Sequence, residues 1–293
     1  MDAIKYPDIP LYHYTSLGAL IGIVENSTIR LTDYRFLNDT SELFFAINEL
    51  QQQLVKFVDH RFYSFVLEAM ENIKNEKMLC FPIVGEQDGK ATVTPSLQDA
   101  HYYVLSLSQK ADELPMWRMY AKNGCCIKFN SQKIHEFFHA FRDKYMAKGI
   151  FNIIQGEVLY GPQQLFDADF LDMFFQHPNM FMLYGDILCY CLKRKTAAFE
   201  YEAEYRLGFH FGDHLFEKSD SEKNIDVEKV FVQSDNVIKP QIELKDFPVK
   251  ELIEEIIVSP YNTSDLTVLG IQELLAKHSI SKNIVKKSTV TIR

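Results

Sequence analysis

The sequence predicts an α+β protein in which short apolar strands and amphipathic helices follow one another along 293 residues. Residues 102–108 (YYVLSLS) are aromatic and aliphatic, which is typical of a buried strand. Residues 131–148 instead repeat apolar side chains at helical spacing. Hydrophobic residues make up 47% of the chain, enough for a sizeable core. Because no repeat, low-complexity tract or long linker intervenes, residues 1–293 are expected to form a single domain.

The N-terminal elements lie close together, and the first strand is expected to lead directly into a helix capped by Thr15 or Ser16. The expected order is a strand at 11–14, a helix at 17–25, a strand at 28–31, a polar loop at 33–42, helices at 41–58 and 61–80, and a loop at 85–90. Residues 41–100 are therefore predicted as a helical insertion.

The second half is expected to return to the sheet around another helical insertion, at about residues 131–196. The expected order is a strand at 102–108, a short helix from Pro115, a strand at 125–130, a helix at 131–148, a strand ending at 160, a buried helix at 181–195, strands at 203–211, 229–233, 237–245 and 252–260, a helix of about 14 residues, and a final strand at 286–293.

The formal net charge of −9 disfavours nucleic-acid binding except at a local patch. Two basic runs are candidates, and both are expected to be solvated surface: Lys193, Arg194 and Lys195, and Lys286 with Lys287. The five cysteines include no C-x-x-C pair, so we expect reduced thiols and no metal site. Without a signal sequence or an apolar run of about 18 residues, the protein is expected to be soluble and cytoplasmic, with no membrane partner.

Acidic side chains gather before and within the strand at 203–211. If residues 200–206 are extended, Glu200, Glu202, Glu204 and Arg206 share one face of the strand. Like charges spaced about 7 Å apart are tolerated more easily in a cleft where a ligand or an arginine offsets them. The alternative is an exposed edge that carries a Glu–Arg pair.

His13 lies between Tyr12 and Tyr14 at the end of the first strand, immediately before a helix start. A hydrogen-bonded core histidine is one interpretation. The other is a ligand site, because backbone and side-chain donors can converge where a strand passes into a helix. Thr15 serves as a cap or as a ligand contact in the two cases.

Two further groups could bind a nucleotide. Tyr34, Arg35, Asn38 and Asp39 lie in the polar loop, where turn formation and capping explain the same residues. Trp117, the one tryptophan, and Tyr120 lie on the short helix and could be core anchors or a stacking platform for a base. The common phosphate-binding, metalloprotease and hydrolase motifs are absent from the sequence.

Four separated blocks resemble the family called domain of unknown function 2971 (DUF2971). They are LYHYTSLGALIGIVENSTIRLTDYRFLNDTSE, VLSLSQKADELPMWRMYAKNGCCIKFN, FEYEAEYRL, and the segment from IVSPYN to KKSTVTIR. A strand histidine, a helix that ends in a short β segment and a late strand glutamate are also similar to the His-Tyr-Glu arrangement of the ADP-ribosyltransferase fold. That similarity implies a mixed, mostly antiparallel split sheet flanked by helices.

The resemblance also implies roles for individual residues. His13 would hold the ribose of NAD, Tyr34 would pack on nicotinamide, and Glu204 would be the catalytic carboxylate, with Glu202 as the first glutamate of a Glu-x-Glu pair. Arg35 or Arg206 would neutralise the pyrophosphate. The remaining candidate cofactor-binding residues are Tyr14, Thr15, Asn38, Asp39, Trp117 and Tyr120.

The function that follows is an NAD-dependent ADP-ribosyltransferase that modifies an unknown protein or nucleic-acid acceptor, in bacterial conflict or phage defence. NAD is then a substrate, and a regulatory protein partner remains open. A carboxylate suits this reaction because cleavage of the nicotinamide bond develops positive charge on the ribose. The alternatives are an NAD glycohydrolase and a nucleotide-sensing or protein-binding module without turnover.

Overall fold

The protein is an α+β protein with an open, mixed and mostly antiparallel sheet and several helices. The structure is a computed structural model that describes residues 6–37, 42–60, 63–87, 89–146, 150–161, 180–212, 227–234 and 236–292. Its strands are β1 (Leu11–Thr15), β2 (Ile29–Asp33), β3 (Lys77–Gln87), β4 (Lys90–Ser108), β5 (Cys125–Phe129), β6 (Ile150–Glu157), β7 (Leu159–Tyr160), β8 (Arg194–Lys195), β9 (Glu204–Gly212), β10 (Val227–Ser234), β11 (Val237–Leu244), β12 (Ile253–Val258) and β13 (Val285–Lys287).

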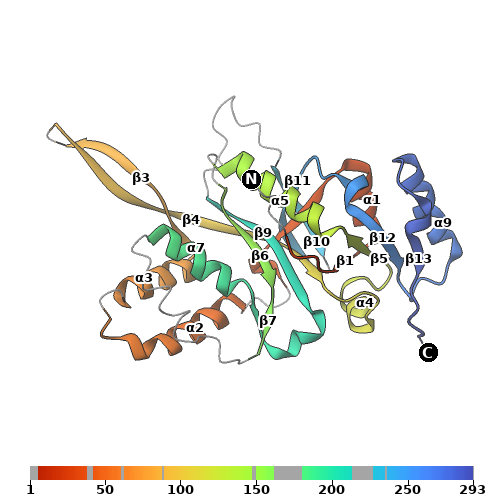
Figure 1. Cartoon of the computed structure of the whole chain (residues 1–293), viewed down its shortest axis with the longest axis horizontal. Helices are drawn as coiled ribbons and strands as arrows, with labels where there is room; N and C mark the ends of the chain where they lie inside the picture. Colours follow the sequence, from red (N-terminus) through yellow and green to blue (C-terminus); the bar gives the residue numbers. More distant parts are fainter. Residues whose placement is uncertain are drawn as a thin grey trace.

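The long strand β4 organises the sheet. One path of hydrogen-bonded strands runs β10-β11-β2-β4-β1-β5-β12-β13, and β4 also pairs with β3 and β9, while β6 pairs with β9. Among the described strands, parallel pairing occurs between β12 and β13 and between β7 and β8. Figure 1 shows β3 and β4 projecting from the body of the molecule as a long hairpin.

β1 and β2 share one edge of β4 without meeting each other. β1 contacts β4 through the pair Tyr12 and Ser108, and β2 contacts it through Thr32 with Val104 and Asp33 with Tyr103. The residues between these points, 105–107, pair with β9 on the other edge of β4. The sheet is therefore split between β1 and β2. The structure agrees with the predicted mixed, mostly antiparallel sheet and has a split at this point.

Helices cover both faces of the sheet, and one group of three stands apart at the foot of the hairpin (Figure 1). That group is α2, α3 and α7, which pack on one another. The helices are α1 (Leu17–Asn26), α2 (Glu42–Leu54), α3 (Tyr63–Lys74), α4 (Leu114–Tyr120), α5 (Ser131–Tyr145), α7 (Met180–Cys191), α8 (Val249–Leu252) and α9 (Asp265–Lys277). α1 begins where expected, because the Ser16 side chain accepts a hydrogen bond from the Ala19 amide.

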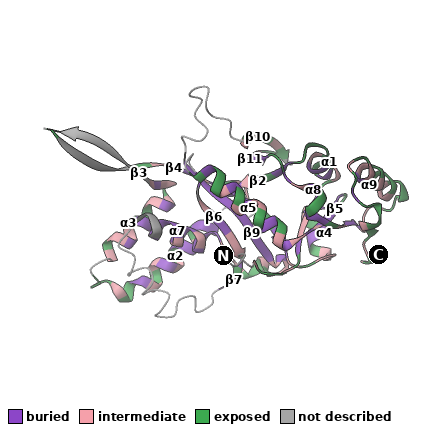
Figure 2. Cartoon of the chain, turned by 45° about the horizontal axis from the view of Figure 1, so that its top comes forward, coloured by how far each residue is buried: buried purple, intermediate pink, exposed green. Residues whose placement is uncertain are grey.

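Two large apolar clusters lie on opposite faces of β4, as strand alternation requires. Tyr102 and Val104 join the cluster of α2, α3 and α7, whereas Leu105 and Leu107 join a larger cluster with α1, α5 and α9. β9 is buried along its whole length between these layers (Figure 2). A charged side chain on β9 must therefore find its partners inside the protein.

Most predicted elements are present, but four expectations are wrong. The helix predicted at 181–195 ends at Cys191, and Arg194–Lys195 is the strand β8. Residues 77–87 and 90–100, placed in a helical insertion, are strands. Residues 197–202 form a 3₁₀ helix rather than the approach of a strand. The final strand ends at Lys287 instead of continuing to the C-terminus. No helix among the described residues has the length and apolar character needed to cross a membrane.

Candidate functional site

A cavity of about 570 Å³ lies at the split between β1 and β2. This volume is within the range of small-molecule sites. Its lining combines apolar walls with convergent polar groups. The residues that bear charged, amide, imidazole or hydroxyl side chains are Tyr12, His13, Tyr14, Thr15, Ser16, Thr28, Arg30, Thr32, Ser106, Ser108, Tyr120, Lys195, Glu202, Glu204, Arg206, Lys239 and Gln241.

His13 closes part of the edge of β4 that the split leaves uncovered. Its Nδ1 lies 3.4 Å from the carbonyl oxygen of Ser106, midway between the points where β1 and β2 pair with β4. A protonated Nδ1 donates to this carbonyl. Burial lowers the pKa of His13 to about 4, against the opposing effect of the Ser106 carbonyl. The imidazole is therefore neutral at pH 7.

The position of β1 depends on a glycine at the start of its neighbour β5. A Cβ added to Gly124 would lie 1.9 Å from the carbonyl oxygen of Thr15, so a larger residue cannot occupy this position without moving the backbone. This close approach fixes the strand end that carries His13, Tyr14 and Thr15 into the cavity wall.

Glu202 and Glu204 reach the cavity from two different elements. Glu202 ends the 3₁₀ helix Ala197–Glu202, Ala203 adopts a left-handed conformation with φ of 40°, and Glu204 begins β9. The expected row of four residues on one strand face is therefore wrong, and Glu200 is exposed. The tight turn at Ala203 nonetheless leaves the two neighbouring carboxylates in the same lining.

Lys195 joins the two carboxylates. Its Nζ lies 2.6 Å from Oε2 of Glu202 and 3.0 Å from Oε2 of Glu204. It also lies 3.2 Å from Oε1 of Glu42, at the start of α2. All four side chains are at most 5% exposed. The expectation that Lys195 and Arg194 are solvated surface is wrong, because both are buried.

Arg206 completes this charged cluster, which we define as Glu42, Lys195, Glu202, Glu204 and Arg206. Its Nε and Nη2 lie 2.8 and 3.0 Å from the two oxygens of Glu204, its Nη1 donates to the Leu192 carbonyl at 2.8 Å, and its Nη2 lies 2.5 Å from Glu42. Three carboxylates face two cations, so the cluster has a net charge of −1 when every member is ionised.

The cluster keeps Glu204 ionised. Burial by itself would raise the pKa of Glu204, but Arg206 and Lys195 outweigh burial and lower the pKa to about 2. Burial raises the pKa of Glu42, against the effects of Arg206 and Lys195. The pKa values of Lys195 and Arg206 are raised because the carboxylates outweigh burial. The cavity therefore contains a fixed negative charge on Glu204 at neutral pH.

Tyr120 connects α4 to the cluster, and its hydroxyl donates to Oε1 of Glu202. Glu202 thus has contacts from Tyr120 and Lys195, which leaves acceptor capacity on a carboxylate that has about four lone-pair positions. Tyr14 also lines the cavity, but its hydroxyl is held by Lys110 and Glu113 of the main chain. Glu202 is therefore suited to accept a hydrogen bond from a ligand.

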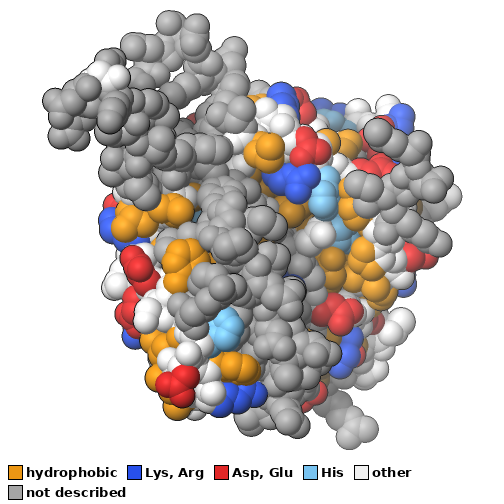
Figure 3. Space-filling model, turned by 60° about the vertical axis from the view of Figure 1, so that its left-hand side comes forward, with side chains coloured by type: hydrophobic (Ala, Val, Ile, Leu, Met, Phe, Trp, Pro, Cys, Tyr) orange, Lys and Arg blue, Asp and Glu red, His pale blue; other side chains and the backbone are white. Residues whose placement is uncertain are grey.

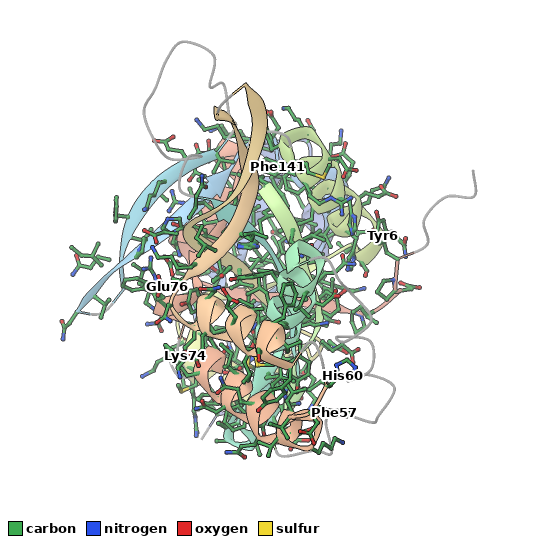
Figure 4. All side chains as sticks on the ribbon, turned by 90° about the vertical axis from the view of Figure 1, so that its left-hand side faces the viewer. Tyr6, Phe57, His60, Lys74, Glu76 and Phe141 are labelled. Atoms are coloured by element: carbon green, nitrogen blue, oxygen red, sulfur yellow. The ribbon has the colours of Figure 1, made fainter. Side chains whose placement is uncertain are left out.

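Three residues expected at the site lie outside the cavity lining. The Tyr34 hydroxyl donates to Glu76 at 3.1 Å, and Arg35 pairs with Asp33 and Glu76 at 2.7 and 3.0 Å. Figure 4 places Glu76 near the foot of the long hairpin. Trp117 is fully buried, and its Nε1 donates to Asp112 at 2.9 Å. Asn38 and Asp39 lie outside the described residues.

The cavity does bring together the other expected residues: His13, Tyr14, Thr15, Tyr120, Glu202, Glu204 and Arg206. Sequence reasoning missed Lys195, which it placed on the surface, and gave no role in the cavity to Arg30 or Lys239. A signal for Lys195 was available, because an acidic row on a buried strand requires cations beyond Arg206. For Arg30 and Lys239, the pairing of β2 with β11 was needed.

These features define an α+β protein with a charged, partly apolar cavity at the split of its sheet. Residues 116–207 match the model of the family described as "Protein of unknown function (DUF2971)". The matched segment runs from α4 into β9 and includes Tyr120, Lys195, Glu202, Glu204 and Arg206. The expected resemblance to this family is confirmed over that segment. Neither the curated proteins nor the solved structures contain a match to the chain.

Proposed function

We propose that the chain is an NAD-dependent ADP-ribosyltransferase that modifies a macromolecular acceptor. The observation that carries this proposal is the lining of one cavity by His13, Glu202 and Glu204, with Glu204 held ionised. A neutral imidazole and an ionised carboxylate are the two groups that ribose positioning and oxocarbenium stabilisation need.

Glu204 and Glu202 have different roles in this proposal. Glu204 is bound by Arg206 and Lys195, so it supplies fixed negative charge near the ribose rather than accepting a proton. Glu202 keeps acceptor capacity and receives a hydrogen bond from a ribose hydroxyl. Such a bond strengthens as positive charge develops on the sugar.

The chemical step breaks the glycosidic bond between nicotinamide and the ribose. Nicotinamide leaves with the bonding electron pair as a neutral base, and the ribose carbon becomes electron-poor. A nucleophile of the acceptor then donates an electron pair to that carbon and releases a proton to solvent. The ionised carboxylate of Glu204 stabilises the positive charge as it moves from the nicotinamide ring to the ribose in the transition state.

Aromatic support for nicotinamide would come from residues other than Tyr34. Tyr12, Tyr14 and Tyr120 line the cavity, and Tyr120 contacts the same carboxylate that we assign to the ribose. We therefore place the nicotinamide ring beside Tyr120. Stacking on an aromatic ring stabilises a cationic heterocycle by about 0.5–2 kcal/mol.

The fate of NAD tests this proposal. The purified protein is incubated with NAD labelled in its adenosine part, together with bacterial protein and RNA fractions. Label that becomes covalently attached to protein or RNA supports the transferase. Release of free ADP-ribose alone would assign the chain as a glycohydrolase, and saturable NAD binding without turnover would assign it as a binding module. Heat-unfolded protein is the control for chemical glycation.

A further inference from the structure

The cavity is charged at both ends, and the ends lie on different strands. β9 supplies Glu204, whereas β2 and β11 supply Arg30 and Lys239. The strand order β9-β4-β2-β11 separates the outer two strands by three spacings, which is about 14 Å. A ligand that reaches both ends is longer than one nucleoside.

The floor between the two ends is one continuous face of the sheet. Directly paired residues of neighbouring antiparallel strands point to the same face. Glu204 pairs with Ser108, Val104 pairs with Thr32, and Thr32 pairs with Gln241. Ser108 and Val104 share a face of β4 because they are four residues apart, and Lys239 shares a face of β11 with Gln241. One sheet face therefore leads from Glu204 to Lys239.

The cations at the two ends of the cavity differ in how far carboxylates already pair with them. Lys195 and Arg206 are saturated by the carboxylates of the charged cluster. Lys239 forms no salt bridge with any residue that the structure describes, although it lines the cavity and is half-buried. Arg30 pairs with Glu243 through Nε at 2.7 Å, and its side chain is 45% exposed. Its two terminal nitrogens make no hydrogen bond to a described residue.

The hydroxyl of Thr32 is set up to donate into the same end. Gln241 donates through Nε2 to Oγ1 of Thr32 at 3.0 Å. A hydroxyl that accepts one hydrogen bond retains its own hydrogen for another acceptor. Lys239, Arg30 and Thr32 therefore present donors and positive charge, and the nearby Glu243 is already engaged by Arg30.

We infer that Arg30 and Lys239 form a subsite for the diphosphate group of a dinucleotide, at the end of the cavity opposite Glu204. This inference rests on the proposed function, because that function places a cationic nicotinamide riboside at Glu204. NAD carries its negative charge on the diphosphate, so the two poles of the ligand match the two poles of the cavity. Arg35 and Arg206, which the sequence suggested for this role, are committed to carboxylates.

The test compares ligands with and without the diphosphate. Binding of NAD, ADP-ribose and nicotinamide riboside is measured by calorimetry for the parent and for Lys239→Gln. Loss of one charge contact is expected to weaken NAD and ADP-ribose about 10-fold. Nicotinamide riboside should change by less than about 2-fold. Lys245→Gln, which removes a charge after the end of β11, is the matched control and should change none of them.

A second variant removes the other cation without leaving a buried carboxylate alone. Arg30→Gln combined with Glu243→Gln should weaken NAD and ADP-ribose while sparing nicotinamide riboside. If the parent binds NAD and both variants bind it equally well, the diphosphate subsite is wrong and the proposed function stands. If the parent binds neither NAD nor ADP-ribose, the proposed function fails and the subsite fails with it.

Discussion

Nζ of Lys195 lies 3.0 Å from Oε2 of Glu204, and each side chain is only 4% exposed. The contact links two residues nine positions apart that sequence patterns place in different environments, one on the surface and one on a strand. A buried ammonium between carboxylates is stabilising only while its partners remain, because an unpaired buried charge costs several kcal/mol. The stability of the cavity therefore depends on Lys195.

Lys195→Met should destabilise the protein by about 3–5 kcal/mol, because Glu42, Glu202 and Glu204 would face Arg206 alone. Urea unfolding measures this change. Adding Glu202→Gln to Lys195→Met should recover part of the loss, since it removes one of the unpaired carboxylates. A double variant as unstable as the sum of the two single variants would show that the contact is not coupled.

His13 should make stability depend on pH between about 6.5 and 4. Its folded-state pKa of about 4 lies below the unfolded value of 6.5, so the unfolded chain binds a proton first as the pH falls. The stability that neutral His13 maintains is present above pH 6.5 and is lost as the pH falls toward 4. The loss is about 1–3 kcal/mol for a group that the cavity partly exposes.

The variant His13→Gln isolates this contribution from those of the other histidines. Glutamine does not titrate, so the unfolding free energy of the variant should fall less steeply than that of the parent over this pH window. Urea unfolding at half-unit pH intervals gives both curves. Parallel curves would mean that the ring of His13 takes up its proton at an ordinary pKa.

Tyr34→Phe should lower stability by about 1 kcal/mol and leave NAD turnover unchanged. The substitution removes the hydrogen bond from the hydroxyl to Glu76, which lies outside the cavity lining. Thermal unfolding measures the change in stability, and an NAD turnover assay measures the activity. A tenfold loss of turnover at unchanged stability would return Tyr34 to the position beside nicotinamide that the ADP-ribosyltransferase resemblance implies.

Tyr120→Phe, unlike Tyr34→Phe, should lower the turnover of NAD. Its hydroxyl orients Glu202 within the lining, so its loss should reduce kcat about 10-fold to 100-fold. KM for NAD should change less, because the ring remains available for stacking. Steady-state kinetics separate kcat from KM, and Tyr14→Phe is the control from the same lining. Equal losses of kcat in both variants would argue against a particular role for Tyr120.

The sequence predicts the elements better than their contacts. The strand that carries His13 and the helix after it are confirmed, because apolar spacing and the Ser16 cap are local signals. The hairpin of β3 and β4 was missed, although the Asp88–Gly89 pair is a turn signal, since apolar spacing up to Met78 suggested a continuing helix. Gly89 has a φ of 75°, a left-handed backbone conformation that glycine adopts readily in a turn.

The candidate site was predicted in part. His13 and Glu204 were expected to face one cleft, and both line the cavity. Tyr34 and Arg35 are polar neighbours in sequence, but they lie in the 3₁₀ helix Tyr34–Phe36 after β2, where both contact Glu76, a partner 41 or 42 residues away. Lys195 belongs to a basic run, and only tertiary packing decides that Arg194 and Lys195 are buried while Lys193 is partly exposed.

On the face shown in Figure 3, basic and acidic side chains of the described residues are interspersed.

We propose that Glu204 stabilises positive charge on the ribose of NAD. It is tested most directly by the turnover of NAD by Glu204→Gln, with Glu200→Gln as the control because Glu200 is exposed. Circular dichroism and thermal unfolding first establish that both variants are folded. Turnover by Glu204→Gln should fall at least about 100-fold, and Glu200→Gln should match the parent. A folded Glu204→Gln variant that consumes NAD as fast as the parent would contradict the claim.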